Sequence, residues 1–159
     1  MKMFEVYPNL FIGSESECFF KHSNDWAVIH ACKSPCHQRV VGYEGSLPST
    51  HPNYLIYEVG NHLFLNMIDP STPLFKPQLF VASLDFIEKH ISERKVLIHC
   101  NLGLSRAPSI ALLYLAKRAK VINEEGYPEA VQDFLKLFRR YQPARGIALY
   151  LSIHWLEFE

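Results

Sequence analysis

Cys100 and Arg106, six positions apart, form the pair of residues with the clearest chemical meaning in this sequence. The apolar run at 95–99 predicts a buried strand that ends at the cysteine, and Pro108 indicates a helix that begins just after the arginine. A strand, a short loop and a helix N-terminus direct backbone N–H groups and the positive end of the helix dipole toward one point. The same field favours the thiolate, the nucleophilic form of cysteine. We therefore expect an anion-binding loop with Cys100 as nucleophile.

The loop itself is expected to hold a phosphate group mainly through its backbone. Gly103 provides the conformational freedom that a tight curl requires. The planar guanidinium of Arg106 can bind two phosphate oxygens at once and stabilise charge in the transition state. Ser105 is a candidate donor inside the loop, whereas His99 either orients the nucleophile or satisfies nearby carbonyls. The expected phosphate-binding residues are Asn101, Leu102, Gly103, Leu104, Ser105 and Arg106.

Short apolar runs interleaved with helical patterns must position this loop. Strands are predicted at 4–7, 9–12, 26–30, 54–59, 62–67 and 95–99, and helices at 77–92, 108–120, 128–141 and 146–158. Ser14 is the expected N-cap of a further short helix over 14–22, and the proline-containing residues 32–53 are expected to form a long surface loop. This order predicts an α/β fold. We expect one domain over residues 1–159, with a central mixed sheet of about five strands flanked by helices and a helical C-terminal part.

Composition narrows the possible classes of function. The chain has 159 residues, of which 48% are hydrophobic, enough for one well-filled core. Sixteen basic residues balance sixteen acidic ones, so no overall field favours nucleic acid or an anionic membrane as a partner. No apolar run approaches the length of about 18 residues that a membrane span needs, and no apolar signal core follows Met1. We therefore expect a soluble, cytoplasmic protein.

Cysteine and histidine could also indicate a metal site. The sequence contains four cysteines, namely Cys18, Cys32, Cys36 and Cys100. They are too few to suggest a disulfide scaffold, and we expect all of them to be thiols. Zinc-ligand types gather in one segment, at His30, Cys32, Cys36 and His37. A structural zinc site usually has more closely paired cysteines, so we favour a strand end that runs into a loop, and we expect no metal and no cofactor.

The segment His99-Cys100-x5-Arg106 resembles the signature of the protein tyrosine phosphatase superfamily, and its ending, Gly-Leu-Ser-Arg, resembles that of the dual-specificity branch. Residues 9–13 are similar to the opening strand of that branch, and residues 65–69 to the segment that carries its general acid. Residues 130–143 are similar to its late helix. The likeness covers nearly the whole chain apart from residues 32–53. It is specific, because a strand, a helix and an upstream aspartate accompany the short pattern.

The resemblance implies a phosphatase of the protein-tyrosine-phosphatase-like fold, which hydrolyses phosphomonoesters through a cysteinyl-phosphate intermediate. The implied substrate and partner is a phosphorylated protein, with phosphotyrosine first and phosphoserine and phosphothreonine as further candidates. The resemblance assigns Cys100 as nucleophile, Arg106 as phosphate clamp, and Asp69, 31 positions before the cysteine, as general acid and then base. Taken alone, Asp69 would equally suit a turn before Pro70. Two alternatives stay open, namely a catalytically weak phospho-binding module and a phosphatase for a non-protein substrate. No oligomeric state is predicted.

The sequence departs from the family pattern at the position after the arginine. Many members have Ser or Thr there, and the hydroxyl assists the leaving thiolate, whereas this chain has Ala107. Slower breakdown of the phosphoenzyme is therefore expected, unless Ser105 or Ser109 compensates. The loop also lacks the extra cations of lipid-phosphatase relatives, which argues against phosphoinositides. The positions concerned are Asn101, Leu102 and Leu104.

Overall fold

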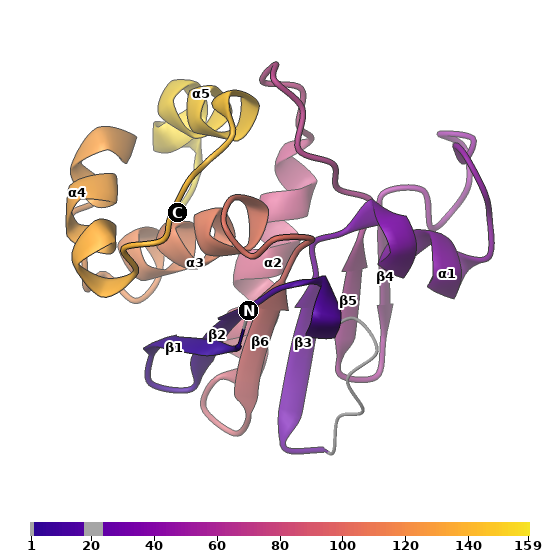
Figure 1. The fold of residues 1–159 in the computed structure, drawn as a ribbon, viewed down its shortest axis with the longest axis horizontal. Helices are drawn as coiled ribbons and strands as arrows, with labels where there is room; N and C mark the ends of the chain where they lie inside the picture. The colour runs from indigo at the N-terminus through magenta and orange to yellow at the C-terminus, as the bar shows by residue number, and fades with distance from the viewer. Residues whose placement is uncertain (1, 18–23) are drawn as a thin grey trace.

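The computed structural model describes residues 2–17 and 24–159. Within these ranges the chain forms a six-stranded sheet and five α-helices (Figure 1). The strands are β1 (Phe4–Tyr7), β2 (Leu10–Gly13), β3 (Trp26–His30), β4 (Ile56–Val59), β5 (His62–Leu65) and β6 (Lys95–His99). The helices are α1 (Gln38–Val41), α2 (Pro77–His90), α3 (Arg106–Lys117), α4 (Tyr127–Leu137) and α5 (Arg145–His154). Two 3₁₀ turns, Glu15–Glu17 and Trp155–Glu157, and a π-helical turn, Lys33–His37, are also present.

All six strands belong to one mixed sheet with the order β1-β2-β6-β3-β5-β4. β2, β6, β3 and β5 run parallel, while β1 and β4 pair antiparallel at the two edges. The central strands β3 and β6 are almost entirely buried, which explains why their sequences are continuous apolar runs without alternation. The predicted α/β fold with a mixed sheet is confirmed, and the sheet has six strands.

The parallel strands determine where a site can form. Carboxyl ends of parallel strands meet at one edge of a sheet, which is where ligands bind in α/β folds. β2, β3, β5 and β6 therefore bring the residues that follow them, Ser14, Ala31, Asn66 and Cys100, to the same edge. The N–H of Ala31 donates to the carbonyl of His99 at 2.9 Å, which extends the β3–β6 ladder up to the cysteine.

The helix α3 lies at the centre of the molecule, and all its residues from Arg106 to Lys117 are buried. It packs on β2 and β6, and α2 packs on α3, β5 and β6. α4 and α5 lie together beside α3, away from β4 (Figure 1). Aromatic side chains pack the C-terminal part against α2. The ring of Phe80 on α2 lies 5.3 Å from that of Tyr150 on α5 and 5.7 Å from that of Phe158. Burial of each such side chain contributes about 1.5–3 kcal/mol.

All four predicted helices differ in length from their predicted spans, and α2 ends at His90 instead of residue 92. α3 begins at Arg106 and not at Pro108, because the N–H of Ser109 already bonds the carbonyl of Ser105 at 3.0 Å. α4 ends at Leu137, because Phe138 leaves the helical conformation and buries its ring 5.3 Å from that of Phe4. The helix predicted at 146–158 is divided into α5 and the 3₁₀ turn that follows it.

Residues 32–53 are not irregular throughout, as predicted, but contain the turn Lys33–His37 and the helix α1. α1 ends at Val41 and is followed by the C-cap Gly42, whose φ of 90° lies in the left-handed region that terminates helices. Of the helix predicted at 14–22, the described part forms the 3₁₀ turn Glu15–Glu17, and the rest, with Cys18, lies outside the described residues. No helix in the described ranges is long and apolar enough to cross a bilayer.

Candidate active site

Cys100 directly follows β6 and lies at the N-terminus of α3. Its side chain is only 2% exposed, and its sulfur accepts a hydrogen bond from the backbone N–H of Ala107 at 3.4 Å. The loop between them turns at Gly103, whose φ of 74° favours glycine. The predicted order of strand, loop and helix is therefore present, and the N–H of Ala107, in the first turn of a 12-residue helix, faces the sulfur. This environment stabilises negative charge on the sulfur or on a bound anion.

Arg106 is buried and curls back over the loop. Its Nη1 donates to the carbonyl of Met67 at 2.7 Å, and its Nη2 donates to Oδ1 of Asn101 at 2.6 Å. Nε has no hydrogen-bond partner among the described residues. Two hydrogen bonds thus fix the guanidinium plane, and the N–H of Nε can donate to an oxygen of a bound ligand. Sequence analysis predicted the arginine, but it treated Asn101 only as a backbone donor and did not single out the carbonyl of Met67.

Asp69 lies four residues after the end of β5, on the loop that leads to α2. It shares a cavity of about 290 Å³ with Cys100 and Arg106, so the structure brings the three predicted catalytic residues together. Its Oδ1 is buried without a hydrogen-bond partner among the described residues. A carboxyl group in this position can exchange a proton with a ligand bound in the cavity. Of the six predicted phosphate-binding residues, all but Gly103 line the cavity, namely Asn101, Leu102, Leu104, Ser105 and Arg106.

His99 lies behind the loop, fully buried between neighbouring strands. Its Nε2 lies 2.7 Å from Nδ1 of His30 on β3, and Nε2 of His30 lies 3.0 Å from Nδ1 of His62 on β5. Burial lowers the pKa of His62, which favours a neutral imidazole near neutral pH. The histidine before the nucleophile therefore contacts another imidazole. The two roles considered from the sequence, an orienting contact and a bond to a carbonyl, did not include this arrangement.

The described cysteines differ in redox state. Cys32 and Cys100 are free thiols, whereas Cys36 is disulfide-bonded, so the prediction of thiols throughout is wrong for Cys36. Burial raises the pKa of Cys32 and keeps it protonated. Its sulfur donates to the carbonyl of Ser34 at 2.9 Å and lies 3.5 Å from Oδ1 of Asn101. Cys32 is thus a structural neighbour of the loop and a poor competitor of Cys100 as nucleophile.

The histidine and cysteine side chains of the segment after β3 do not form the four-residue group considered as a zinc site. His37 bonds the hydroxyl of Tyr43 at 2.7 Å and the carbonyl of Asn53 at 3.0 Å. His30, Cys36 and His99 do converge, with ligand atoms within 4.8 Å of one another. Because the sulfur of a disulfide is not a thiolate, this group lacks the ligand type that zinc prefers.

The hydroxyl groups near Ala107 are engaged away from the nucleophile. Oγ of Ser105 accepts a hydrogen bond from the N–H of Ala144 at 2.9 Å, so it supports the loop from outside. Oγ of Ser109 lies 2.7 Å from the hydroxyl of Tyr141, and burial raises the pKa of that tyrosine well above its usual value. Tyr141 is therefore neutral at any working pH. The contacts of Ser105 and Ser109 therefore do not favour the alternative in which one of them compensates for Ala107.

Ala107→Ser tests this departure directly. Ala107 is fully buried, and its N–H already bonds the sulfur of Cys100. A hydroxyl at the same position should stabilise the departing thiolate, so kcat should rise about 3- to 10-fold, below the full effect of a hydrogen bond to a charged group. The unmodified protein should show a burst of the first product in rapid-quench kinetics, and the variant should lose it. Ser105→Ala is the control and should keep the burst. Absence of a burst in the unmodified protein would show that thiolate departure is not limiting.

Gly146, near the start of α5, packs against the loop that carries Asp69. A methyl group at this position would overlap the backbone carbonyl oxygens of Pro70 and Thr72. Gly146→Ala should therefore displace the loop and lower kcat on an aryl phosphate by about 10- to 100-fold, because small misplacements of catalytic groups are costly. Ser152→Ala, an exposed change on the same helix, is the matched control, and circular dichroism checks the fold of both. An unchanged kcat in Gly146→Ala would mean that the position of this loop does not matter for turnover.

Sequence comparison relates the chain to known phosphatases. It is 29% identical over 123 residues to human dual specificity protein phosphatase 16, which is 77% of this chain and 16% of that protein. It is 28% identical over 132 residues to human dual specificity protein phosphatase 2, which is 83% of this chain and 36% of that protein. The chain therefore spans well under half the length of these relatives. No protein-family model matches the sequence.

Solved structures show the same fold. The human tyrosine phosphatase-like serine/threonine/tyrosine-interacting protein superposes with a TM-score of 0.68, covering 98% of this chain and 96% of that one at 17% identity. The structure of DUSP15 superposes with a TM-score of 0.65, covering 96% of this chain and 86% of that one at 16% identity. The expected protein-tyrosine-phosphatase-like fold is thereby confirmed.

Proposed function

Because this chain is similar in sequence to dual-specificity protein phosphatases and has the fold of their superfamily, we propose that it hydrolyses phosphomonoesters through a cysteinyl-phosphate intermediate. One observation carries the proposal. The sulfur of Cys100 accepts a hydrogen bond at the N-terminus of α3 and opens on the cavity that Arg106 and Asp69 also line. A nucleophile, an anion clamp and a proton donor therefore lie around one space.

In the first step, the thiolate of Cys100 attacks phosphorus and forms the S–P bond while the bond from phosphorus to the leaving oxygen breaks. Asp69 transfers its proton to that oxygen, so the product leaves as a neutral alcohol or phenol. The guanidinium of Arg106 and the loop amides bind the other phosphate oxygens, where negative charge develops. Nε of Arg106, the guanidinium nitrogen without a partner among the described residues, is the donor for one of these bonds.

In the second step, water attacks phosphorus, and the carboxylate of Asp69 accepts the proton that the water loses. The S–P bond breaks, Cys100 leaves as a thiolate, and inorganic phosphate is released. The N–H of Ala107 is the contact that stabilises the departing sulfur. All the proton transfers use one carboxyl group, which ends each cycle in the protonated form.

The proposed substrate is a phosphoprotein, with phosphotyrosine preferred and phosphoserine and phosphothreonine as further possibilities. Leu102, which is 71% exposed, and Leu104 line the cavity beside the nucleophile and offer apolar contact to a phenyl ring. The mechanism also requires Cys100 to stay reduced. We therefore propose a reducing compartment such as the cytoplasm, where the disulfide at Cys36 would be an exception to the usual thiol state of cysteines.

Three phosphopeptides of one sequence, carrying phosphotyrosine, phosphothreonine or phosphoserine, test this proposal together with an aryl phosphate. Release of inorganic phosphate from the aryl phosphate and from the phosphotyrosine peptide is expected, and kcat/KM should be highest for phosphotyrosine. Saturable peptide binding without release of phosphate would contradict the proposal and would support the alternative of a phospho-binding module.

A further inference from the structure

A second cavity continues from the proposed active site along the carboxyl edge of the sheet. An open passage lined by Asp69 and Arg106 adjoins the catalytic cavity and leads past Met67 and Ile68 to Lys33. Lys33, Met67 and Ile68 also line the next cavity, of about 250 Å³, which we call the Met67 pocket. The passage therefore shares lining residues with both cavities, which places the Met67 pocket next to the proposed active site.

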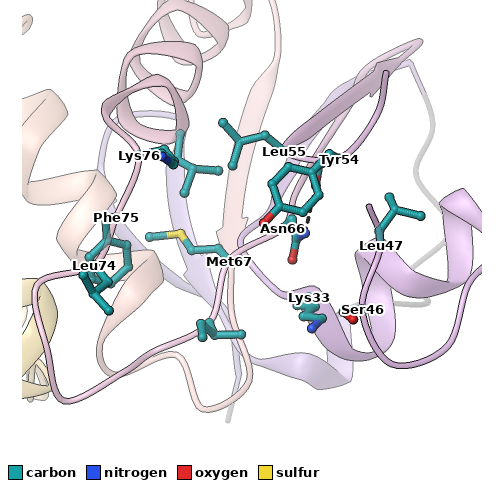
Figure 2. Close-up of a pocket in the computed structure, with 12 residues that line it drawn as sticks. Lys33, Ser46, Leu47, Tyr54, Leu55, Asn66, Met67, Leu74, Phe75 and Lys76 are labelled. Atoms are coloured by element: carbon teal, nitrogen blue, oxygen red, sulfur yellow. Dashed lines mark hydrogen bonds between the residues drawn. The ribbon is translucent and has the colours of Figure 1, made fainter. Parts of the chain in front are cut away.

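Apolar and polar side chains together line the Met67 pocket. Figure 2 shows Leu74 and Phe75 on one side of it, Tyr54 and Lys33 on the other, and Met67 between them. Its volume is below the range of about 300–1,000 Å³ that is typical of pockets for whole small molecules. It therefore suits one side chain better than a complete ligand. The buried apolar residues among its lining are Met67 and Leu79.

Backbone hydrogen bonds connect the pocket rigidly to the phosphate clamp. The carbonyl of Met67 accepts from the N–H of Lys33 at 3.1 Å and from Nη1 of Arg106 at 2.7 Å. Nδ2 of Asn66 donates to the carbonyl of Tyr54 at 2.8 Å, which holds the opposite wall. The distance between the clamp and the pocket is thus fixed by the fold. Such fixed spacing allows a site to select one position of a bound peptide.

The charges that line the Met67 pocket indicate which kind of substrate residue would be attracted to it. Lys33 and Lys76 line the Met67 pocket, no acidic residue is among its described lining residues, and neither lysine forms an ion pair within the described ranges. Glu15 and Asp69 line the passage nearer the active site, and Nδ2 of Asn101 donates to Glu15 at 3.0 Å. The excess of positive charge is therefore local to the pocket, where an acidic substrate residue would be attracted.

The loop that carries Asp69 presents further apolar surface between the two cavities. Ile68 is 55% exposed and Leu74 is 78% exposed. These side chains flank the route from the catalytic cavity to the Met67 pocket. A peptide in extended conformation advances about 3.3 Å per residue, so a side chain a few positions from the phosphorylated residue reaches the pocket.

We propose that the Met67 pocket is a specificity subsite that accepts one leucine-like or phenylalanine-like side chain of a phosphoprotein substrate, beside an acidic residue that faces Lys33. This inference rests on the proposed phosphatase function and names the class of substrate sequence that the same site selects. It predicts a preference for apolar residues with an acidic neighbour at one fixed distance from the phosphorylated residue.

A positional scan tests the subsite. In a phosphotyrosine peptide with alanine at the three positions on each side, leucine is moved through these positions one at a time. One position should raise kcat/KM by about tenfold over alanine, as expected for burial of one apolar side chain. Aspartate next to that leucine should add about 2- to 5-fold, and this gain should vanish in Lys33→Gln, since a partly exposed charge pair is weak.

Ser46→Trp places an indole at the mouth of the pocket, and Ser49→Trp makes the same change three positions away, outside its lining. The ratio of kcat/KM for the leucine peptide to that for the alanine peptide should fall to about one in Ser46→Trp and should stay near tenfold in Ser49→Trp. A scan with no preferred position, or a preference that survives Ser46→Trp, would overturn the inference.

Binding measurements separate this inference from the catalytic proposal. The same peptides are titrated into Cys100→Ser and followed by fluorescence anisotropy, which requires no turnover. A leucine preference in Kd without hydrolysis by the unmodified protein would support the subsite and reject the phosphatase mechanism. Hydrolysis of the aryl phosphate, with neither kcat/KM nor Kd depending on the neighbouring residues, would reject the subsite and leave the mechanism standing.

Discussion

Cys100→Ser is expected to lower turnover of an aryl phosphate by about 10⁴-fold or more, because a serine hydroxyl at this position is not appreciably ionised near neutral pH. The fold should survive. The sulfur accepts one hydrogen bond from the described residues, from the N–H of Ala107, and the serine oxygen can accept the same bond. Steady-state kinetics measure the loss, and thermal unfolding followed by circular dichroism should give a Tm within a few degrees of that of the unmodified protein.

Cys32→Ser is the matched control for this experiment, because Cys32 is the other free thiol among the described cysteines. It contacts Asn101 beside the loop, and burial raises its pKa, so it is protonated at neutral pH. We expect kcat of Cys32→Ser to stay within about tenfold of the original value, since no bond to phosphorus forms at this sulfur. Turnover by Cys100→Ser close to that of the unmodified protein would mean that another group is the nucleophile.

Asp69→Asn is expected to lower kcat for substrates with poor leaving groups by about 10²- to 10³-fold, because proton transfer to the leaving oxygen is lost. The effect should shrink for aryl phosphates whose phenols are strongly acidic, since those leaving groups need little protonation. The pH profile of kcat/KM provides a second readout. If Asp69 is the general acid, the basic limb of this profile should flatten in the variant.

Asp85→Asn makes the same chemical change at an aspartate on α2, which pairs with Arg118 at 3.1 Å. Its kinetic constants should match those of the unmodified protein, because Asp85 does not line the catalytic cavity. A basic limb that is identical in Asp69→Asn and in the unmodified protein would assign the general acid to a different residue. A uniform loss for all leaving groups would instead indicate a structural effect of the substitution.

The elements around the nucleophile could be predicted because local sequence determines them. The run before Cys100 is continuous and apolar, and Pro108 falls in the first turn of α3, so strand, loop and helix follow from short-range patterns. Asp69 was assigned by resemblance and not by local pattern, because an aspartate before a proline is equally typical of a turn. The structure shows in addition that Asp69 lines the same cavity as Cys100.

Contacts between distant segments could not be predicted. The carbonyl of Met67 binds Arg106 across 39 positions, and no side-chain type marks a carbonyl for such a role. Gly146 supports the loop of Asp69 by lacking a side chain, which a sequence indicates only as one glycine near a helix start. Phe138 leaves α4 because its ring packs on β1, so tertiary packing overrides the helical pattern there. Cys36 is disulfide-bonded, whereas the small number of cysteines predicted that all of them would be thiols.

The covalent intermediate tests the central claim most directly. The enzyme is mixed with an aryl phosphate, quenched with acid within milliseconds, digested and analysed by mass spectrometry. One phosphoryl group is expected on the peptide that contains Cys100, absent from Cys100→Ser, and accumulating more in the unmodified protein than in Ala107→Ser. Rapid product formation with no phosphoryl group on Cys100 at any quench time would contradict the account.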